Sequence, residues 1–231
     1  VVRQASAHAA HPQADVCTDS GCCQAYVERQ AAETRWGISA GTYSAKTSQA
    51  VADTDGLGIL YQGAPIQAVF FSSAPGQTAD AVAVWGSQVD YLKSVSSPER
   101  DEVPNYRSQV VLTAEEVRSR VLAAYPGADL SGDPSGWFGT PASSGGAVTS
   151  IPVGGVTLTG SQVRTLFSLR SAAFTVAWDG TSFTFSVTGY GHGVGMSQYG
   201  ANAMAKEGSS FRDILTWYYT GAQVDDLWAE S

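Results

Sequence analysis

Residues 174–187 read Phe174-Thr-Val-Ala-Trp178, Asp179-Gly-Thr181 and Ser182-Phe-Thr-Phe-Ser-Val187. Large apolar side chains alternate with small ones in both outer runs, and this period of two is typical of strands that bury one face. Asp179-Gly180 between the runs is a common turn of an antiparallel hairpin. The segment therefore predicts two antiparallel strands, the strongest hairpin in the chain.

The sequence on either side of this hairpin predicts helices as well as strands. Thr113-Ala-Glu-Glu116 is a capping box, in which side chains satisfy backbone N–H groups of a first helical turn, and Thr159 is a second cap. Because the strands meet in hairpins and the helices cluster apart along the chain, the expected fold class is α+β. Residues 126–150 are rich in Gly, Ser and Pro, which predicts an exposed loop or insertion. Helices are expected over 113–125, 159–167, 197–208 and 211–219, and a further hairpin between 57–61 and 66–71.

Composition narrows the class of protein. With 231 residues, 43% of them hydrophobic, the chain is long enough to bury a real core, and its net charge of −8 would repel nucleic acid. No run approaches the roughly 20 consecutive apolar residues that cross a bilayer. The chain starts without Met, so we expect it to be part of a longer protein, and a missing signal peptide says nothing about export.

Residues 189–201 read Gly189-Tyr-Gly-His-Gly-Val-Gly-Met-Ser-Gln-Tyr-Gly-Ala201 and form the most informative stretch. Four alternating glycines let the backbone approach another group closely, while His192 is presented on the loop. A dinucleotide site needs a Gly-x-Gly-x-x-Gly turn inside a βαβ unit, whereas these glycines follow an antiparallel hairpin, so that interpretation is disfavoured. From composition alone, a glycine-rich turn that carries a surface histidine explains the stretch equally well.

The whole run resembles the end of the SpoIID/LytB family domain. That family has a glycine-histidine-glycine, Gly-Met-Ser-Gln, Gly-Ala loop, then a Met-Ala-x-x-Gly helix and an Ile-Leu-x-x-Tyr-Tyr-x-Gly helix. The matching stretches here are residues 191–201, 204–208 and 214–221. The resemblance implies one domain over 1–224, which lacks the N-terminal part of the family domain, and a tail over 225–231. It also implies a loop lining a glycan cleft, with His192, Ser197 and Gln198 as substrate contacts.

A second block resembles the same family, and its centre is Phe71-Ser-Ser-Ala-Pro-Gly-Gln-Thr78. The family pattern there is Ser-Gly-Gly-x-Thr, so the chain departs from it at Ala74. The resemblance implies further substrate contacts from Ser72, Ser73 and Thr78. Ordinary loop hydrogen bonding stays open as the alternative, since no histidine and carboxylate lie nearby in sequence to activate either serine.

A third block offers one imidazole and three thiols, from His11, Cys17, Cys22 and Cys23. Zinc prefers four such ligands, and three cysteines with one histidine are an established structural set. In the family this stretch has a histidine, a cysteine and an adjacent His-Cys pair, so Cys22 replaces a histidine, an exchange that a metal site tolerates. We expect a structural zinc ion. A disulfide from Cys17 to Cys22 or Cys23 is the alternative, and His8 could replace His11.

The resemblance implies a peptidoglycan lytic transglycosylase, which cleaves glycan strands and leaves 1,6-anhydro-muramic ends. In the family a glutamate in a Glu-x-Met-Pro-type stretch is the acid and base, and that stretch is not present in the chain. We therefore expect this glutamate upstream, and the chain alone to be inactive. Four internal carboxylates are candidate replacements, but each has a good interpretation as a turn, cap or surface residue: Asp53, Asp80, Glu99 and Asp213.

The resemblance also implies partners and a setting. The substrate would be glycan strands stripped of stem peptides, the partner a cell-wall amidase, and the process sporulation and engulfment. The protein would be exported to the envelope of a Gram-positive spore former, with membrane anchoring through an N-terminal segment left open. The main alternative is a non-catalytic amidase enhancer that binds glycan. A purely structural, zinc-stabilised domain without a glycan site is a third interpretation.

Overall fold

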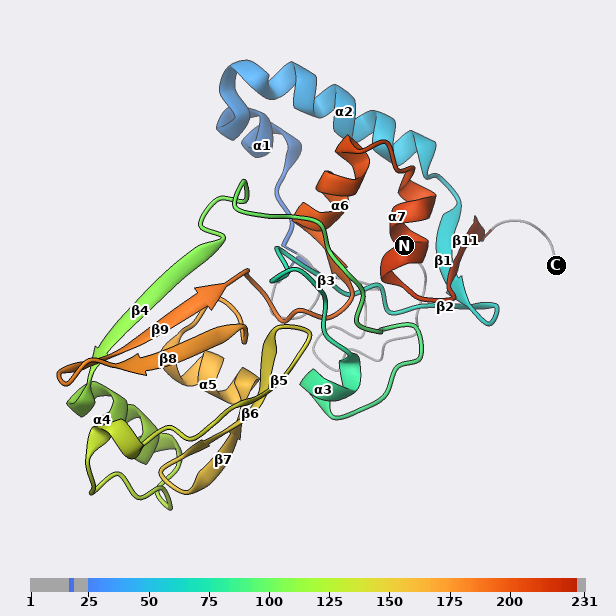
Figure 1. Ribbon diagram of the computed structural model, residues 1–231. Helices are drawn as coiled ribbons and strands as arrows, with labels where there is room; N and C mark the ends of the chain where they lie inside the picture. Colours follow the sequence, from blue (N-terminus) through green and yellow to red (C-terminus); the bar gives the residue numbers. More distant parts are fainter. Residues whose placement is uncertain (1–16, 19–24, 228–231) are drawn as a thin grey trace. The chain divides into compact units, whose positions relative to one another are not determined.

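The computed structural model describes residues 17–18 and 25–227 (Figure 1). By its internal contacts the chain divides into two compact units, residues 1–58 with 225–231, and residues 59–224. The tail that we expected over residues 225–231 stays a prediction. A single domain over 1–224 stays a prediction. No helix in the described part of the chain is long and apolar enough to span a bilayer.

The first unit contains α1 (Arg29–Trp36), the 3₁₀ turn η1 (Gly37–Ser39) and α2 (Ala40–Asp53). Glu33 joins the helices, because its carboxylate accepts from the Arg29 guanidinium at 2.8 Å and from the Ser44 hydroxyl at 2.7 Å. The Trp36 and Tyr43 rings meet edge to face, with centroids 5.7 Å apart. Neither helix has a buried residue, and neither was predicted, since the sequence shows no apolar stripe there.

The second unit is built around a three-stranded antiparallel sheet of β4 (Arg107–Thr113), β9 (Ser182–Thr188) and β8 (Phe174–Trp178), with β9 in the centre. The predicted hairpin is confirmed, with Trp178 opposite Phe183. Burial alternates along β9, and Phe185 is fully buried. Helix α4 (Ala114–Ala124) packs on β4 and β9, and α5 (Gly160–Phe167) contacts α4 (Figure 1).

A second small sheet completes this core and corrects one expectation. It consists of β5 (Ala142–Ser144), β6 (Ala147–Val153) and β7 (Val156–Thr159), preceded by the 3₁₀ turn η2 (Pro134–Gly136). The prediction of an exposed loop over 126–150 is therefore wrong in part. Leu130 and Trp137 are buried, and the Trp137 ring stacks on Phe183 with centroids 5.7 Å apart. Ala128 and Val148 are buried in the same core, so apolar side chains hold a segment that is otherwise Gly- and Ser-rich.

The remaining elements are short helices and strands, and one pair of the strands joins two segments that are distant in the sequence. They are β1 (Leu57–Tyr61), β2 (Ala64–Pro65), β3 (Phe70–Phe71), α3 (Ala81–Trp85), β10 (Met196–Ser197), α6 (Gln198–Lys206), α7 (Phe211–Tyr218) and β11 (Gln223–Asp226). The hairpin expected between 57–61 and 66–71 is wrong at its second strand, since β1 pairs with β2 whereas β3 pairs in parallel with β10. A core beside this pair contains Ala79, Ala81, Leu92, Val194, Tyr219 and Ala222.

The predicted helix starts are confirmed by their caps. The Thr113 hydroxyl accepts from the Glu116 N–H, and the Glu116 carboxylate accepts from the Thr113 N–H. The same reciprocal pair joins Thr159 to Gln162 at α5, and Ser210 to Asp213 at α7. Each box satisfies backbone donors that a first helical turn leaves without partners.

Candidate functional site

The two segments that resemble the family most closely lie side by side. The N–H of Ser73 donates to the carbonyl of Tyr190 at 3.1 Å, and the N–H of Tyr190 donates back to Ser73 at 2.9 Å. Further along, the Ala79 N–H donates to the Gly193 carbonyl at 2.8 Å. These bonds and the β3–β10 pair hold residues 69–79 against residues 189–199. The predicted contacts from the two blocks therefore belong to one place in the fold.

The alternating glycines are explained by this close approach. All four, at 189, 191, 193 and 195, have positive φ angles, which side chains with a Cβ rarely adopt. A Cβ at Gly195 would overlap the carbonyl oxygen of Val69, and one at Gly191 would lie 2.7 Å from the Cβ of Phe71. The group that the glycines allow the loop to approach is the protein's own chain.

His192 is held by hydrogen bonds at both ring nitrogens. Nδ1 accepts from the Val194 N–H at 3.1 Å, so Nε2 carries the proton and donates to the Phe70 carbonyl, also at 3.1 Å. Burial lowers the pKa of His192 below its usual 6.5, and the positive charge of Arg164 lowers it further. The ring is therefore neutral at pH 7. The ring holds the loop in its conformation. It exposes its edge and face to a ligand, and neither nitrogen is available to titrate near pH 7.

The other residues predicted to contact substrate differ in how exposed their side chains are. Thr78 is fully buried, and its hydroxyl donates to the Lys93 carbonyl and accepts from the Val95 N–H. Ser73 and Ser197 are also buried, Ser72 is partly exposed, and Gln198 is exposed. A direct role in substrate binding stays a prediction for all six residues.

Glu99 is a fully buried carboxylate, and our interpretation of it as a turn, cap or surface residue is wrong. Its Oε1 accepts from the Ala74 N–H at 2.6 Å and from the Ser197 hydroxyl at 2.5 Å. Ser197 in turn accepts from the Gly200 N–H and caps α6. One carboxylate thus ties the 72–74 segment to the start of α6, directly beneath the glycine-rich loop.

The other oxygen of Glu99 faces a crowded polar corner. Glu99 Oε2 is buried and has no hydrogen-bond partner in the described structure. A Cβ at Gly200 would overlap the hydroxyls of Ser97 and Tyr218 and approach this oxygen to 2.7 Å, so only glycine fits there. The Ser97 and Tyr218 hydroxyls bond each other at 2.6 Å, and burial raises the pKa of Tyr218 to about 12. This closely packed polar cluster supports the fold and is not an open catalytic pocket.

The remaining carboxylates considered have ordinary roles in the structure. Asp213 belongs to the α7 capping box, and Asp53 accepts from the Gln49 amide at the end of α2. Asp80 occupies the N-cap position of α3 and lies 4.0 Å from the Lys93 ammonium. Ser197 bonds Glu99 and His192 bonds a backbone carbonyl, so the described residues here form no Ser–His nucleophile pair.

Exposed aromatic side chains flank the loop, and no sequence pattern predicted a role for them. Trp85 of α3 is 43% exposed, and its ring centroid lies 5.7 Å from that of His192. Tyr190 is 44% exposed on the loop itself. Rigid, amphipathic rings of this kind provide apolar faces for a ligand together with polar edges. Their signal in the sequence was only an aromatic residue beside each glycine motif.

The predicted zinc ligands are mostly outside the described residues. Cys17 is described and is partly exposed, whereas His11, Cys22 and Cys23 fall in the ranges that the structure leaves out. Among residues 17–18 and 25–227 no group of three or more metal-binding side chains occurs. The zinc site therefore stays a prediction.

Comparison with known proteins identifies relatives. No family model matches the chain. It is 38% identical over 215 residues to Stage II sporulation protein D of Bacillus subtilis (strain 168), covering 93% of this chain and 61% of that protein. The protein of the same name from Bacillus amyloliquefaciens is 35% identical over 208 residues, covering 90% and 59%. The Amidase enhancer of Bacillus subtilis (strain 168) is 26% identical over 232 residues, covering 79% and 33%. The chain thus spans about three fifths of the two sporulation proteins.

Proposed function

Because the chain belongs to the SpoIID/LytB family, we propose that it is the glycan-binding part of a protein that remodels the cell wall during sporulation. The proposal rests on the hydrogen-bonded contact between residues 69–79 and residues 189–199. This arrangement gathers the family-like segments around one loop, with exposed Trp85 and Tyr190 beside it.

In this proposal the residues of the chain bind and orient the strand. The Trp85 and Tyr190 rings pack against sugar faces, and the exposed Gln198 amide bonds sugar hydroxyl or acetamido groups. His192 fixes the loop through its two backbone bonds, and Glu99 fixes the base of the loop through Ser197. Support of this kind preorganises a binding surface and lowers the cost of ordering it on binding.

We assign the whole protein a lytic transglycosylase reaction. A carboxyl group protonates the glycosidic oxygen, and the bond from that oxygen to the anomeric carbon of muramic acid breaks. The C6 hydroxyl oxygen of the same sugar then bonds the anomeric carbon and gives its proton to the carboxylate, so that a 1,6-anhydro end forms without water. The family resemblance assigns the carboxyl to a Glu-x-Met-Pro-type stretch, which the 231 residues do not contain.

The test is mass spectrometry of peptide-free glycan strands after incubation with protein. Two samples are compared, the 231-residue chain and the product of the whole coding sequence. Anhydro-muramic ends made by the whole product only are the expected result, and unmodified strands that also fail to bind would overturn the proposal. Trp85→Ala should weaken strand binding, whereas Phe211→Ala, which removes an exposed ring on α7, should not.

A second candidate function is amidase enhancement without cleavage. The observation that favours it is the match to the Amidase enhancer over 79% of the chain. In that case the protein would bind the strand and present it to a cell-wall amidase. Intact strands, normal binding and a faster amidase in a reconstituted mixture would identify this function and exclude the transglycosylase.

We also propose a structural zinc site and export to the cell envelope. The donor set of His11, Cys17, Cys22 and Cys23 suits zinc in chemistry and number. Metal analysis should find about one zinc per chain, retained in Cys22→His and lost in Cys22→Ser. A Cys17–Cys22 or Cys17–Cys23 disulfide in the protein purified from its own compartment would refute the zinc site. Fractionation of the native cells tests the location.

A further inference from the structure

The hairpin of β5 and β6 has an open edge at which one residue directs its backbone groups outward. In the sheet order β5–β6–β7, β5 is an edge strand, and its residues Ala142–Ser144 are all exposed. The Val148 N–H donates to the Ala172 carbonyl at 2.8 Å, and the Val148 carbonyl lies against Gly160, so both groups point away from β5. Ser143, which lies opposite Val148, is therefore in a non-hydrogen-bonded pair, and its own N–H and C=O point to the open edge.

The turn of this hairpin lies against the segment between β3 and α3. Gly145 and Gly146 form the turn with positive φ angles, and a Cβ at Gly145 would lie 2.7 Å from the Thr78 carbonyl oxygen. A Cβ at Gly146 would lie 3.3 Å from the Pro75 side chain. Figure 1 shows the hairpin reaching this segment, which continues into α3 and its exposed Trp85.

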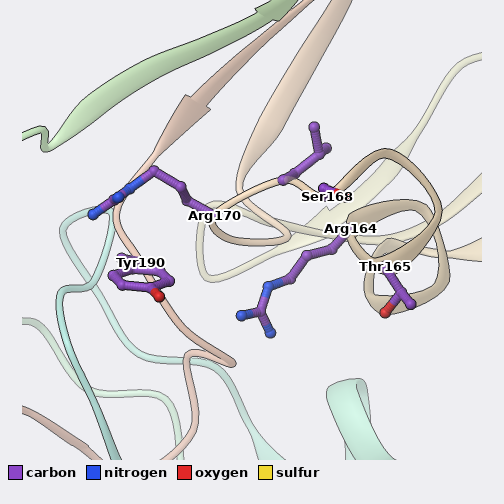
Figure 2. Close-up of a pocket in the computed structure, with 6 residues that line it drawn as sticks. Arg164, Thr165, Ser168, Arg170 and Tyr190 are labelled. Carbon is purple, nitrogen blue, oxygen red and sulfur yellow. The ribbon is translucent and has the colours of Figure 1, made fainter.

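The base of the hairpin is joined to a segment that supports the glycine-rich loop. Val148 bonds Ala172, and two residues earlier the Arg170 carbonyl accepts from the Gly191 N–H at 3.0 Å. The Arg170 guanidinium carbon lies 4.1 Å from the centroid of the Tyr190 ring, a cation–π contact that orients this exposed ring (Figure 2). At its two ends the hairpin thus contacts segments next to the two exposed rings of the proposed glycan site.

An acetamido group suits this edge in its chemistry. The unpaired N–H of an edge strand needs a strong acceptor, and an amide carbonyl is the acceptor that a neighbouring strand would supply. The carbonyl oxygen of an acetamido group extends further from the sugar ring than a hydroxyl oxygen does, so it can reach a backbone N–H between side chains. The side chains of β5 are those of alanine and serine, which are small enough to let a sugar approach the backbone.

We infer that the edge of β5 binds the N-acetyl groups of the glycan through the backbone of Ser143. The Ser143 N–H donates to the acetamido carbonyl, and the Ser143 carbonyl accepts from a sugar hydroxyl. This contact makes the protein prefer N-acetylated sugars to sugars with a hydroxyl group at the same carbon. The inference rests on the proposed glycan-binding function and adds to it the residue that determines the type of sugar.

An edge that is bonded only to water is the competing explanation, since short edge strands are common and need no ligand. The other edge strand of the same sheet, β7, provides the comparison. Pro152 has no N–H and its carbonyl accepts from the Gly139 N–H, so Thr157, which lies opposite Pro152, also directs its N–H outward. Proline at this position measures what the loss of any outward N–H does to the sheet.

The experiment compares binding of a chitin tetrasaccharide and a cellulose tetrasaccharide. Both are uncharged and have the same linkage, and they differ in the acetamido or hydroxyl group at C2 of each sugar. Wild-type protein should bind the chitin oligomer roughly tenfold more tightly. Ser143→Pro removes only an outward N–H, which an edge strand tolerates, and should abolish most of this preference. Ser143→Ala keeps the N–H and should bind as wild type does, and so should Thr157→Pro.

NMR gives a second measurement that does not depend on how the proline variants fold. In the wild-type protein the amide resonance of Ser143 should shift when the chitin oligomer is added and stay in place with the cellulose oligomer. The amide resonance of Thr157 should stay in place with both. A Ser143 resonance that ignores the chitin oligomer while the oligomer binds would overturn the inference.

Three binding results would also overturn it. They are equal affinity of the wild-type protein for the two oligomers, the same loss in Ser143→Ala as in Ser143→Pro, and the same loss in Thr157→Pro as in Ser143→Pro. If peptide-free glycan strands bind but the two oligomers are not distinguished, the inference fails and the proposed function stands. If neither the strands nor either oligomer binds, both fail.

Discussion

Replacing Glu99 by alanine should destabilise the protein by about 3–5 kcal/mol. The Ala74 N–H loses its acceptor in a fully buried site, which costs about 1–3 kcal/mol. One methylene and the carboxylate leave the core; the methylene accounts for about 0.8 kcal/mol, and the cavity left by both groups adds to this. The Ser197 hydroxyl contributes less, because the Ser72 carbonyl at 3.3 Å is a second acceptor.

The matched variant is Glu99→Gln, which keeps an acceptor oxygen for the Ala74 N–H and fills the same space. It should cost about 1–3 kcal/mol, less than Glu99→Ala, because the acceptor and the volume are kept while the new amide N–H groups enter the buried site where Oε2 has no partner. Urea unfolding followed by the fluorescence of the six tryptophans gives both free energies. Amide hydrogen exchange at Ala74 gives a local measure, and protection there should fall in the alanine variant.

Two results would refute this reasoning. A loss below about 1 kcal/mol in Glu99→Ala would mean that the acceptor is replaced by water or by a shifted backbone. An equal loss in Glu99→Gln and Glu99→Ala would mean that the charge of Glu99, rather than its hydrogen-bond geometry, holds the site.

Three further predictions concern the loop and the core. Because the pKa of His192 is lowered in the folded protein, the unfolded chain binds more protons between that pKa and 6.5, and the free energy of unfolding should fall as the pH drops through this window. In His192→Asn the free energy of unfolding should not fall in this window. NMR titration of His192 should find a midpoint below 6.5. Gly195→Ala should lower the free energy of unfolding in urea by more than about 3 kcal/mol, because the new Cβ would overlap a carbonyl oxygen. Gly180 also has a positive φ angle but has free space around it, so Gly180→Ala should lower it by only about 1–2 kcal/mol. Equal losses in the two variants would count against the overlap. Phe185→Ala should cost about 3–5 kcal/mol and the exposed Val111→Ala less than about 0.5, and a small loss at Phe185 would mean that the core collapses around it.

Local patterns in the sequence predicted the second unit well. The alternation of residues 174–187 gave the central hairpin, because burial on one face demands a period of two. Threonine hydroxyls at the N-cap positions predicted α4 and α5, since a cap acts within three residues. Such signals can be read from the sequence because the residues that determine each element lie within or next to that element.

Features that depend on distant contacts could not be predicted. Glu99 follows Ser97-Pro98 and resembles a loop residue, and only the fold reveals that Ala74 and Ser197 surround it. Trp137 lies in a segment that is rich in Gly, Ser and Pro, and only the fold reveals that its ring reaches Phe183 in the sheet. The contact of the Arg170 guanidinium with the Tyr190 ring could not be predicted either, since the two residues lie on different segments.

The pairing of β3 with β10 has a consequence for the order of folding. The bond from His192 to Phe70 spans 122 residues, and the bond between Ser97 and Tyr218 spans 121. The sheet of β4, β8 and β9, in contrast, is complete within residues 107–188 and lies between these partners in the sequence. Because long loops close slowly and at greater entropic cost, this sheet should fold first and bring the ends of the site together. During synthesis the loop therefore acquires its shape only after α7 has left the ribosome, so a stalled or clipped chain retains a folded sheet and has no binding surface.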